Sequence, residues 1–140
     1  MVSKKKNIEQ SETVKLVSGQ VQAGFATWAE EDEGMATDLN IDNYLIEHRE
    51  ATFLVRASGD SMIEAGIHNG DLLVVDRSRY PASGKVVVVV VDGEATIKRL
   101  VKRQGRLFLC PANPTYPDID ITGHEETVIW GVATYVVHQL

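Results

Sequence analysis

Residues 85–101 read KVVVVVVDGEATIKRLV, and this stretch decides the fold. Six consecutive valines at 86–91 are typical of a strand buried on both faces, because β-branched side chains pack well on a pleated surface. Asp92 and Gly93 are a strong two-residue signal for a hairpin turn. Side chains in EATIKRLV, residues 94–101, alternate between two faces. The stretch therefore predicts two antiparallel strands joined by a tight turn.

Strand-like runs continue on both sides of this hairpin, from Phe53 almost to the end of the chain. They are rich in branched and aromatic residues, and Gly, Asp, Asn and Pro separate them. These runs are FLVRA (53–57), DLLVVD (71–76), RLFLC (106–110) and VIWGVATYVV (128–137). We expect a compact, mainly β domain built from strongly curved antiparallel sheets.

The chain before residue 53 has a different character. Residues 39–48, LNIDNYLIEH, predict a short amphipathic helix with Asp38 or Asn40 as its N-cap. Its helical stripe consists of Ile41, Tyr44, Leu45 and His48. Residues 1–38 are polar or small without a sustained period, which predicts an extended, loosely held N-terminal arm. We therefore divide the chain into this arm and a β-rich domain over 39–140.

Composition limits the classes of function. The chain has 140 residues, of which 44% are hydrophobic, enough for one domain with a real core. Fourteen Lys and Arg against twenty Asp and Glu give a net charge of −6. An acidic chain is a poor candidate for strong DNA binding, which needs cations against phosphates. The three lysines at residues 4–6 are too few to make up for the net negative charge. We therefore expect no direct sequence-specific DNA binding.

A single cysteine, Cys110, cannot form an internal disulfide, and no Cys or His spacing suggests zinc. We therefore expect a cytoplasmic protein without a metal or other cofactor. No apolar run reaches the length of a membrane span, and the polar start is not that of a signal peptide. We expect no membrane association.

The main chemical question is Ser61, in the stretch VRASGDSMIEAGIHNGDLLVVD at residues 55–76. A serine hydroxyl needs a neighbouring base before it can act as a nucleophile. The four histidines, for which a structural or surface role is expected, are His48, His68, His124 and His138. Lys98 shares a strand face with Thr96 and Leu100, so partial burial can lower its pKa and supply a free amine. The alternative is a lysine stem on the sheet with its charge in water.

One family carries these residues in the same order. The set SGDSM...GI..GDLLVVD, DGEATIKRL, L.PANPTYPDI and IWGV resembles the LexA/UmuD family of self-cleaving serine–lysine proteases. The resemblance runs from about Val21 to the C-terminus and is closest to the UmuD and MucA branch. It implies the curved β-sheet catalytic domain shared with signal peptidases, with Ser61 as nucleophile and Lys98 as base.

Members of this family cut their own chain at an Ala-Gly or Cys-Gly bond before the catalytic domain. The corresponding bond here is Ala23-Gly24, in SGQVQAGFATWAEED. A small alanine lets the carbonyl approach a crowded lysine, and glycine permits a sharp bend. The family usually continues Phe-Pro-Ser-Pro, whereas this chain has FATW at 25–28, which leaves its docking geometry open.

The resemblance also implies a mechanism. Neutral Lys98 takes the Ser61 proton, Ser61 attacks the Ala23 carbonyl, and an acyl-enzyme forms and is hydrolysed. The backbone N–H groups of Ser61 and Met62 are the expected oxyanion hole. The Met62 side chain is expected to pack beside the cleft, and Asp60 has no assigned catalytic role.

The biological role is likewise implied by the resemblance. Residues 1–23 are too few for the helix-turn-helix module of a repressor, so we expect a UmuD-like SOS-response protein. Its partners are a RecA filament on single-stranded DNA, a second copy in a homodimer, and a Y-family, UmuC-like translesion polymerase. The dimer can use residues 128–137 as a sheet edge, or this strand can be internal.

Three other functions stay open. They are a dimeric binding module with an idle protease, a leader-peptide protease, which needs a membrane anchor, and a regulator that heterodimerises with a related LexA/UmuD-type protein. Intact Ser61 and Lys98 count against the idle protease.

Overall fold

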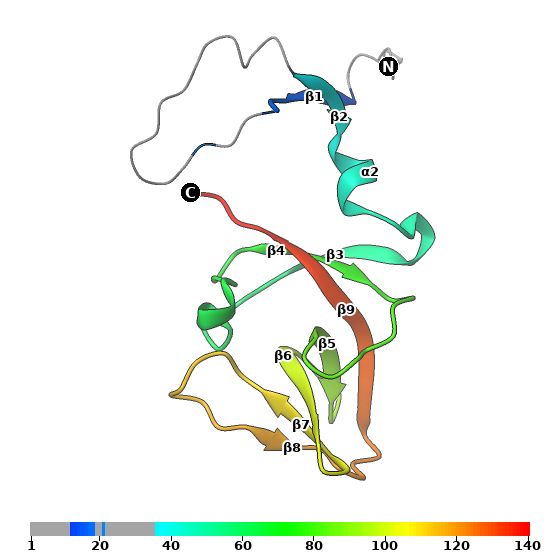
Figure 1. Ribbon diagram of the computed structural model, residues 1–140. Helices are drawn as coiled ribbons and strands as arrows, with labels where there is room; N and C mark the ends of the chain where they lie inside the picture. Colours follow the sequence, from blue (N-terminus) through cyan, green and yellow to red (C-terminus); the bar gives the residue numbers. More distant parts are fainter. Residues whose placement is uncertain (1–11, 19–20, 22–35) are drawn as a thin grey trace, which may run out of the picture. The chain divides into compact units, whose positions relative to one another are not determined.

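The structure is a computed structural model that describes residues 12–18, 21 and 36–140 (Figure 1). The chain divides into two compact units, Met1–Glu47 and His48–Leu140. The domain boundary after residue 38 stays a prediction from the sequence. Among the described residues, no helix has the length and apolar character that crossing a membrane requires.

The described part of the first unit contains a small sheet and one helical turn. Strand β1 (Thr13–Leu16) pairs antiparallel with β2 (Thr37–Asn40), a pairing that the sequence did not predict. Helix α2 (Ile41–Leu45) follows directly, and the Asn40 side chain caps it by accepting a hydrogen bond from the Asn43 N–H at 2.9 Å. The N-cap prediction of Asn40 is thus confirmed.

The predicted helix over 39–48 is too long. The chain leaves helical geometry at Ile46, whose backbone is extended, and no residue of α2 is buried. A single turn without burial gains little from packing, so few residues stay helical. His48 lies beyond the helix and precedes the short 3-10 turn η2 (Arg49–Ala51), so its assignment to a helical stripe was wrong.

The second unit is built on one antiparallel sheet of seven strands in the order β3-β4-β9-β5-β6-β7-β8. The strands are β3 (Thr52–Arg56), β4 (Leu72–Asp76), β5 (Val86–Val91), β6 (Glu94–Arg103), β7 (Arg106–Cys110), β8 (Ile119–Asp120) and β9 (Thr127–Val137). The mainly β, antiparallel fold is therefore confirmed. The sequence missed only the two-residue strand β8 among these strands.

The valine hairpin forms as predicted. Val91 pairs with Glu94, so Asp92 and Gly93 alone make the turn, with φ of 50° and 82°. Both values lie in the left-handed region that a type I′ turn requires. This turn fixes the register that places Lys98 opposite Val87.

Strand β9 is internal to the sheet. Its first half pairs with β5 and its second half with β4, and register shifts occur on both sides, at Val88/Val89 and at Val74/Val75 (Figure 1). Gly131 lies where the two partners meet, and a Cβ there would come within 2.6 Å of Val75 Cγ1. Residues 127–131 pair only with β5 and residues 133–137 only with β4, so each half of β9 keeps one edge without a strand partner among the described residues. Whether a dimer uses residues 128–137 as a sheet edge stays a prediction.

The core lies on both faces of this sheet. Val88 packs with Met62, Ile67 and Val75 in one cluster. Val87 and Val89 pack with Leu100 and Leu109 in the other. Because neighbouring strand residues point to opposite faces, the middle of the valine run contributes to both clusters. Both clusters support the elements that carry Ser61 and Lys98.

Candidate active site

Ser61 lies in the loop between β3 and the short 3-10 turn η3 (Ile63–Ala65). Backbone hydrogen bonds join this loop to the segment after β7. Ala112 N–H donates to the Ser61 carbonyl at 2.8 Å, and Glu64 N–H donates to the Ala112 carbonyl at 2.8 Å. The loop is therefore held on both sides of the serine.

Asp60 contributes to the same attachment. Its carbonyl accepts from Asn113 Nδ2 at 3.0 Å, and its Oδ1 accepts from Tyr116 Oη at 2.6 Å. The bond to the Asp60 carboxylate raises the pKa of Tyr116, so the phenol stays protonated as a donor. On the other side, Gly59 N–H donates to Asn69 Oδ1 at 2.9 Å. Asp60 is thus a positioning residue for the serine turn.

Lys98 reaches Ser61 from β6. Its Nζ lies 3.1 Å from Ser61 Oγ, although the two residues are 37 positions apart in the chain. The same nitrogen lies 2.9 Å from Thr96 Oγ1 and 3.0 Å from the Ile97 carbonyl oxygen. The structure brings the two predicted site residues into direct contact.

The surroundings of Lys98 disfavour its charge. The residue is 9% exposed, and among the described residues its hydrogen-bond partners are all neutral oxygens. Burial lowers its pKa below the ordinary value, since a desolvated ammonium has lost its water without gaining a carboxylate. The prediction of a buried lysine beside Thr96 is confirmed. A neutral amine in this place can accept the Ser61 proton.

The predicted oxyanion donors lie in the same turn. Among the described residues, neither the Ser61 N–H nor the Met62 N–H donates a hydrogen bond, whereas Ile63, Glu64 and Ala65 all do. The Met62 side chain is 3% exposed and packs in the core, as expected from the sequence. Two unused donors beside a serine can stabilise an oxyanion.

A cleft of about 270 Å³ opens beside the serine. One wall is the end of β3 and the loop after it, and the other is the start of β6. The lining residues are Val55, Arg56, Ala57, Ser58, Gly59, Ser61, Met62, Ile67, Val88, Ala95, Thr96 and Ile97. Most are small or apolar, so the cleft suits a peptide with small side chains.

The histidines lie in other polar contacts. The His68 and His138 rings contact each other at a tilt of 37° with centroids 4.6 Å apart, and His124 Nδ1 lies 3.1 Å from Thr127 Oγ1. His48 Nδ1 lies 2.6 Å from Asp76 Oδ2. Within the described part of the chain, no histidine hydrogen-bonds to Ser61.

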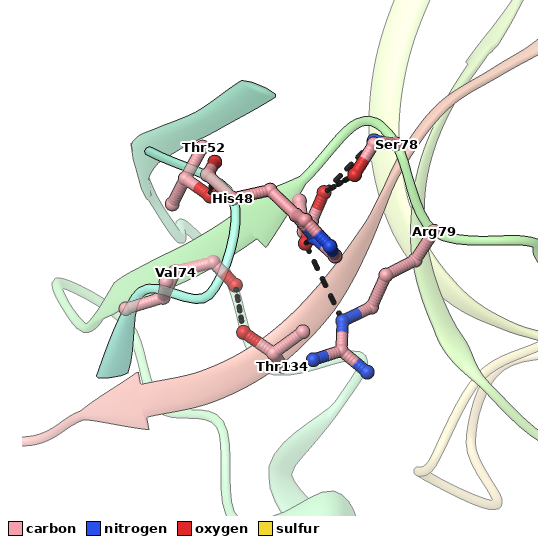
Figure 2. Close-up of polar contacts among 7 residues, drawn as sticks. His48, Thr52, Val74, Ser78, Arg79 and Thr134 are labelled. Carbon is pink, nitrogen blue, oxygen red and sulfur yellow. Dashed lines mark hydrogen bonds and ion pairs between the residues drawn. The ribbon is translucent and has the colours of Figure 1, made fainter. Parts of the chain in front are cut away.

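Asp76, at the end of β4, collects a second set of polar groups. Ser78 donates to Oδ1 from its N–H at 2.8 Å and from Oγ at 2.6 Å. Figure 2 shows His48, Ser78 and Arg79 converging on one carboxylate, and Arg79 Nε lies 3.4 Å from Oδ2. Burial alone raises the pKa of Asp76, but the hydrogen bonds from Ser78 and His48 outweigh it and lower the value to about 2.

Two side-chain to backbone hydrogen bonds connect the elements around Asp76 (Figure 2). Thr52 Oγ1 donates to the His48 carbonyl at 2.6 Å, and Thr134 Oγ1 donates to the Val74 carbonyl at 3.3 Å (Figure 2). This centre joins the turn before β3, the end of β4 and strand β9. Its contacts are those of a structural ion cluster.

The predicted cleavage site, Ala23 and Gly24, lies outside the described residues. Sequence reasoning also missed the residues that hold the serine turn. Asn113 and Tyr116 belong to the PANPTYPDI motif, but Asn69 has no comparable signal. The motif could have identified the first two residues, whereas their contacts to Asp60 depend on the fold.

A serine hydroxyl and a buried lysine nitrogen at hydrogen-bond distance form an arrangement in which a neutral amine can activate the hydroxyl. The family model "Peptidase S24-like" matches residues 15–134. The chain therefore belongs to this family of LexA/UmuD-type proteins. The family assignment supports self-cleaving serine peptidase activity in general.

Individual proteins agree with this assignment. The chain is 42% identical to Protein SamA of Salmonella typhimurium over 91% of this chain and 86% of that protein. It is 43% identical to Protein ImpA of Escherichia coli over 89% and 83%, and 41% identical to Protein MucA of Escherichia coli over 82% and 77%. These UmuD-like relatives support an SOS-related role of the UmuD type.

Proposed function

We propose that this chain cleaves itself between Ala23 and Gly24, with Ser61 as nucleophile and Lys98 as general base. The observation that carries the proposal is the 3.1 Å contact between Ser61 Oγ and a buried Lys98 Nζ whose described hydrogen-bond partners are all neutral. A lysine so placed has no evident stabilising role, because its burial costs free energy that no carboxylate offsets.

The chemical steps use only groups of this chain and water. Neutral Lys98 takes the proton of Ser61 Oγ as the oxygen bonds to the Ala23 carbonyl carbon. The oxyanion accepts hydrogen bonds from the N–H groups of Ser61 and Met62. Collapse breaks the peptide bond, and the Gly24 nitrogen leaves with the proton held by Lys98. Water then hydrolyses the Ala23 ester, with Lys98 again as base.

The shape of the cleft supports this choice of bond. Ala57, Gly59 and Ala95 line it, and they leave room for a peptide backbone close to Ser61. In this proposal the Ala23 side chain enters the cleft, where a methyl group needs much less room than an aromatic ring. We expect Ala23→Trp to stop cleavage, whereas Ala23→Cys, a small replacement, retains it.

We further propose that cleavage is the activating step of an SOS mutagenesis factor in the cytoplasm. A RecA filament on single-stranded DNA stimulates the cut, and residues 24–140 then act as a homodimeric accessory subunit of an error-prone, UmuC-like polymerase. The UmuD-like relatives, at 41–43% identity, support this role. The fold supports it as well, since the sheet and both site residues lie after the proposed cut.

A second candidate is a regulator that heterodimerises with a related repressor. The chain is 40% identical to LexA repressor 2 of Pseudomonas syringae pv. tomato over 116 residues. A shared catalytic fold supplies a surface on which two such chains can pair. Co-purification of this chain with a tagged LexA-type partner distinguishes this candidate from the accessory subunit.

Mass spectrometry of the purified chain tests the proposal. Wild type and Ser61→Ala are incubated with and without a RecA–single-stranded DNA–nucleotide filament. We expect two products in the wild type, Met1–Ala23 and a second fragment that begins at Gly24, formed faster with the filament. A different new N-terminus, or cutting of Ser61→Ala at the same rate, refutes the assignment.

A genetic arm tests the biological role separately. Residues 24–140 are expressed directly in cells that lack the full-length protein. We expect a folded dimer that restores damage-induced mutagenesis. If the fragment is monomeric at micromolar concentration or does not restore mutagenesis, cleavage is not the activating step, although the chemistry at Ser61 can still be correct.

A further inference from the structure

Three potential metal ligands meet at the end of the sheet opposite Asp76. His68 and Asp71 lie in the turn before β4, and His138 follows directly after β9. One ligand atom from each lies within 4.8 Å of the other two. His138 Nδ1 is 2.6 Å from Asp71 Oδ1, and His68 Nδ1 is 3.6 Å from Asp71 Oδ2. Two imidazoles thus flank one carboxylate.

The donor atoms are suited to a cation. Asp71 is 4% exposed, and its two carboxylate oxygens face His138 Nδ1 at 2.6 Å and the His68 N–H at 2.7 Å. His68 Nδ1 is shielded from solvent and has no hydrogen-bond partner among the described residues. Buried polar atoms normally have a partner. A nitrogen with a lone pair beside a carboxylate fits the coordination of a metal ion.

We propose that His68, Asp71 and His138 bind a divalent transition-metal ion, zinc, with water as the fourth ligand. Two histidines and one carboxylate are a common ligand set for Zn²⁺, with bonds of 2.0–2.2 Å. Neighbouring ligand atoms in a tetrahedral site lie about 3.3 Å apart at such bond lengths. The measured separations of 2.6 and 3.6 Å lie on either side of this value.

Coordination through His138 Nδ1 requires the tautomer that carries the hydrogen on Nε2. The present contact between His138 Nδ1 and Asp71 Oδ1 is then exchanged for bonds from both atoms to the metal. Both histidine rings are part-exposed, so they can rotate toward a common point. The guanidinium of Arg56 donates to the carbonyl of Gly70, the residue before Asp71, at 2.7 Å, and its positive charge opposes cation binding.

A metal here ties the end of β9 to the loop before β4. The same loop holds the serine turn, because Asn69 Oδ1 accepts the Gly59 N–H. Additional backbone bonds run from Ala57 N–H to the Asp71 carbonyl and from Gly70 N–H to the Ala57 carbonyl, each at 2.8 Å. The site is therefore a structural clamp behind the candidate active site, distinct from it and free of Ser61 and Lys98.

The test uses the full chain as Ser61→Ala, so that it stays intact, without a histidine tag and after removal of metal. Calorimetric titration with Zn²⁺ should show one ion per chain at micromolar affinity or better. His68→Ala and His138→Ala should each weaken binding at least tenfold. His124→Ala is the matched control and should bind as the parent does, since His124 lies near Asp92 at a separate surface turn.

Visible absorption with Co²⁺ and thermal unfolding with Zn²⁺ distinguish loss of the site from loss of the fold. Co²⁺ should give visible absorption typical of a tetrahedral site in the parent and lose it in the His68 and His138 variants. Zn²⁺ should raise the thermal midpoint of the parent but not theirs, because an ion bound only to the native state stabilises it. Metal-free midpoints show whether each variant is folded.

No saturable binding by the folded parent, or binding of equal affinity in folded His68→Ala, overturns the proposal. The outcome is independent of the proposed self-cleavage, because the measurement reads metal binding in a chain that lacks the nucleophile.

Discussion

Lys98 and Asp76 are two buried charged residues of the same sheet that have opposite surroundings. Asp76 is 3% exposed, and its carboxylate accepts two hydrogen bonds from Ser78. His48 and Arg79 contact the same carboxylate. Lys98 is 9% exposed, and its described partners are a serine, a threonine and a carbonyl. Both pKa values are lowered, which favours the charged form of Asp76 and the neutral form of Lys98.

In the function proposed above, this difference separates a structural charge, Asp76, from a reactive one, Lys98. A buried carboxylate with several donors stabilises the fold that surrounds it. A buried amine without an anion destabilises the fold, and it persists where its neutral form serves a reaction. The partners of each group therefore tell more about its role than its burial does.

The largest expected effect is on self-cleavage. Ser61→Ala should abolish it, and Lys98→Ala should lower its rate at least about a thousandfold, because residues that act as a unit each carry most of the effect. Asp76→Asn is the control and should still cleave. Rates are read from product appearance by mass spectrometry. Comparable loss in folded Asp76→Asn would break the distinction between the two charges.

The next effect is on stability, and its sign should differ between the two sites. Asp76→Ala should lower the free energy of unfolding by about 2–3 kcal/mol, since several donors lose a charged acceptor. Lys98→Met should leave it unchanged or raise it by about 1 kcal/mol, because a similar apolar side chain replaces an uncompensated buried amine. Urea unfolding of both variants in the Ser61→Ala background measures this. Equal destabilisation would show that Lys98 is a structural residue.

Acid unfolding sharpens the role of Asp76. Its pKa is about 2 in the folded chain and 3.8 as the ordinary value. The unfolded state therefore binds the proton first, and the stabilisation present above pH 3.8 is lost as the pH falls toward 2. Asp76→Asn should flatten the pH dependence of the unfolding free energy in this window, measured against Asp118→Asn at an exposed position. An unchanged slope contradicts the assigned hydrogen bonds.

The smallest effect concerns the turn that carries the serine. Tyr116→Phe removes the donor to Asp60 while keeping the ring. We expect a loss of about 1 kcal/mol or less in stability and a fall of less than tenfold in cleavage rate, with the pH dependence unchanged. Tyr80→Phe, whose hydroxyl accepts from Lys102, is the control. A shifted pH profile in Tyr116→Phe would mean that the phenol takes part in proton transfer.

Local patterns in the sequence predicted much of this architecture. The valine run, the Asp92-Gly93 turn and the alternation in β6 placed Lys98 on one face with Thr96, as the structure has it. The helix after residue 39 was too long, because its apolar spacing implied burial that is absent. Its exact end depends on packing, which a stripe of residues does not encode.

The sequence could not predict the long-range contacts that hold the serine turn and the His68–Asp71–His138 cluster together. Asp60 meets Tyr116 across 56 positions, and Asp71 meets His138 across 67. Such pairs depend on the strand order, in which β9 lies between β4 and β5. Nothing local to His68 or His138 indicates that their rings meet.

The central claim is that Lys98 acts as a neutral base, and the pH dependence of unassisted self-cleavage tests it most directly. Burial lowers its pKa below the ordinary value of 10.5, so the rate should rise with pH above pH 7 and level off below pH 10.5. A rate that is flat from pH 7 to 10, or one that peaks near pH 6.5 where histidines titrate, would contradict Lys98 as the base.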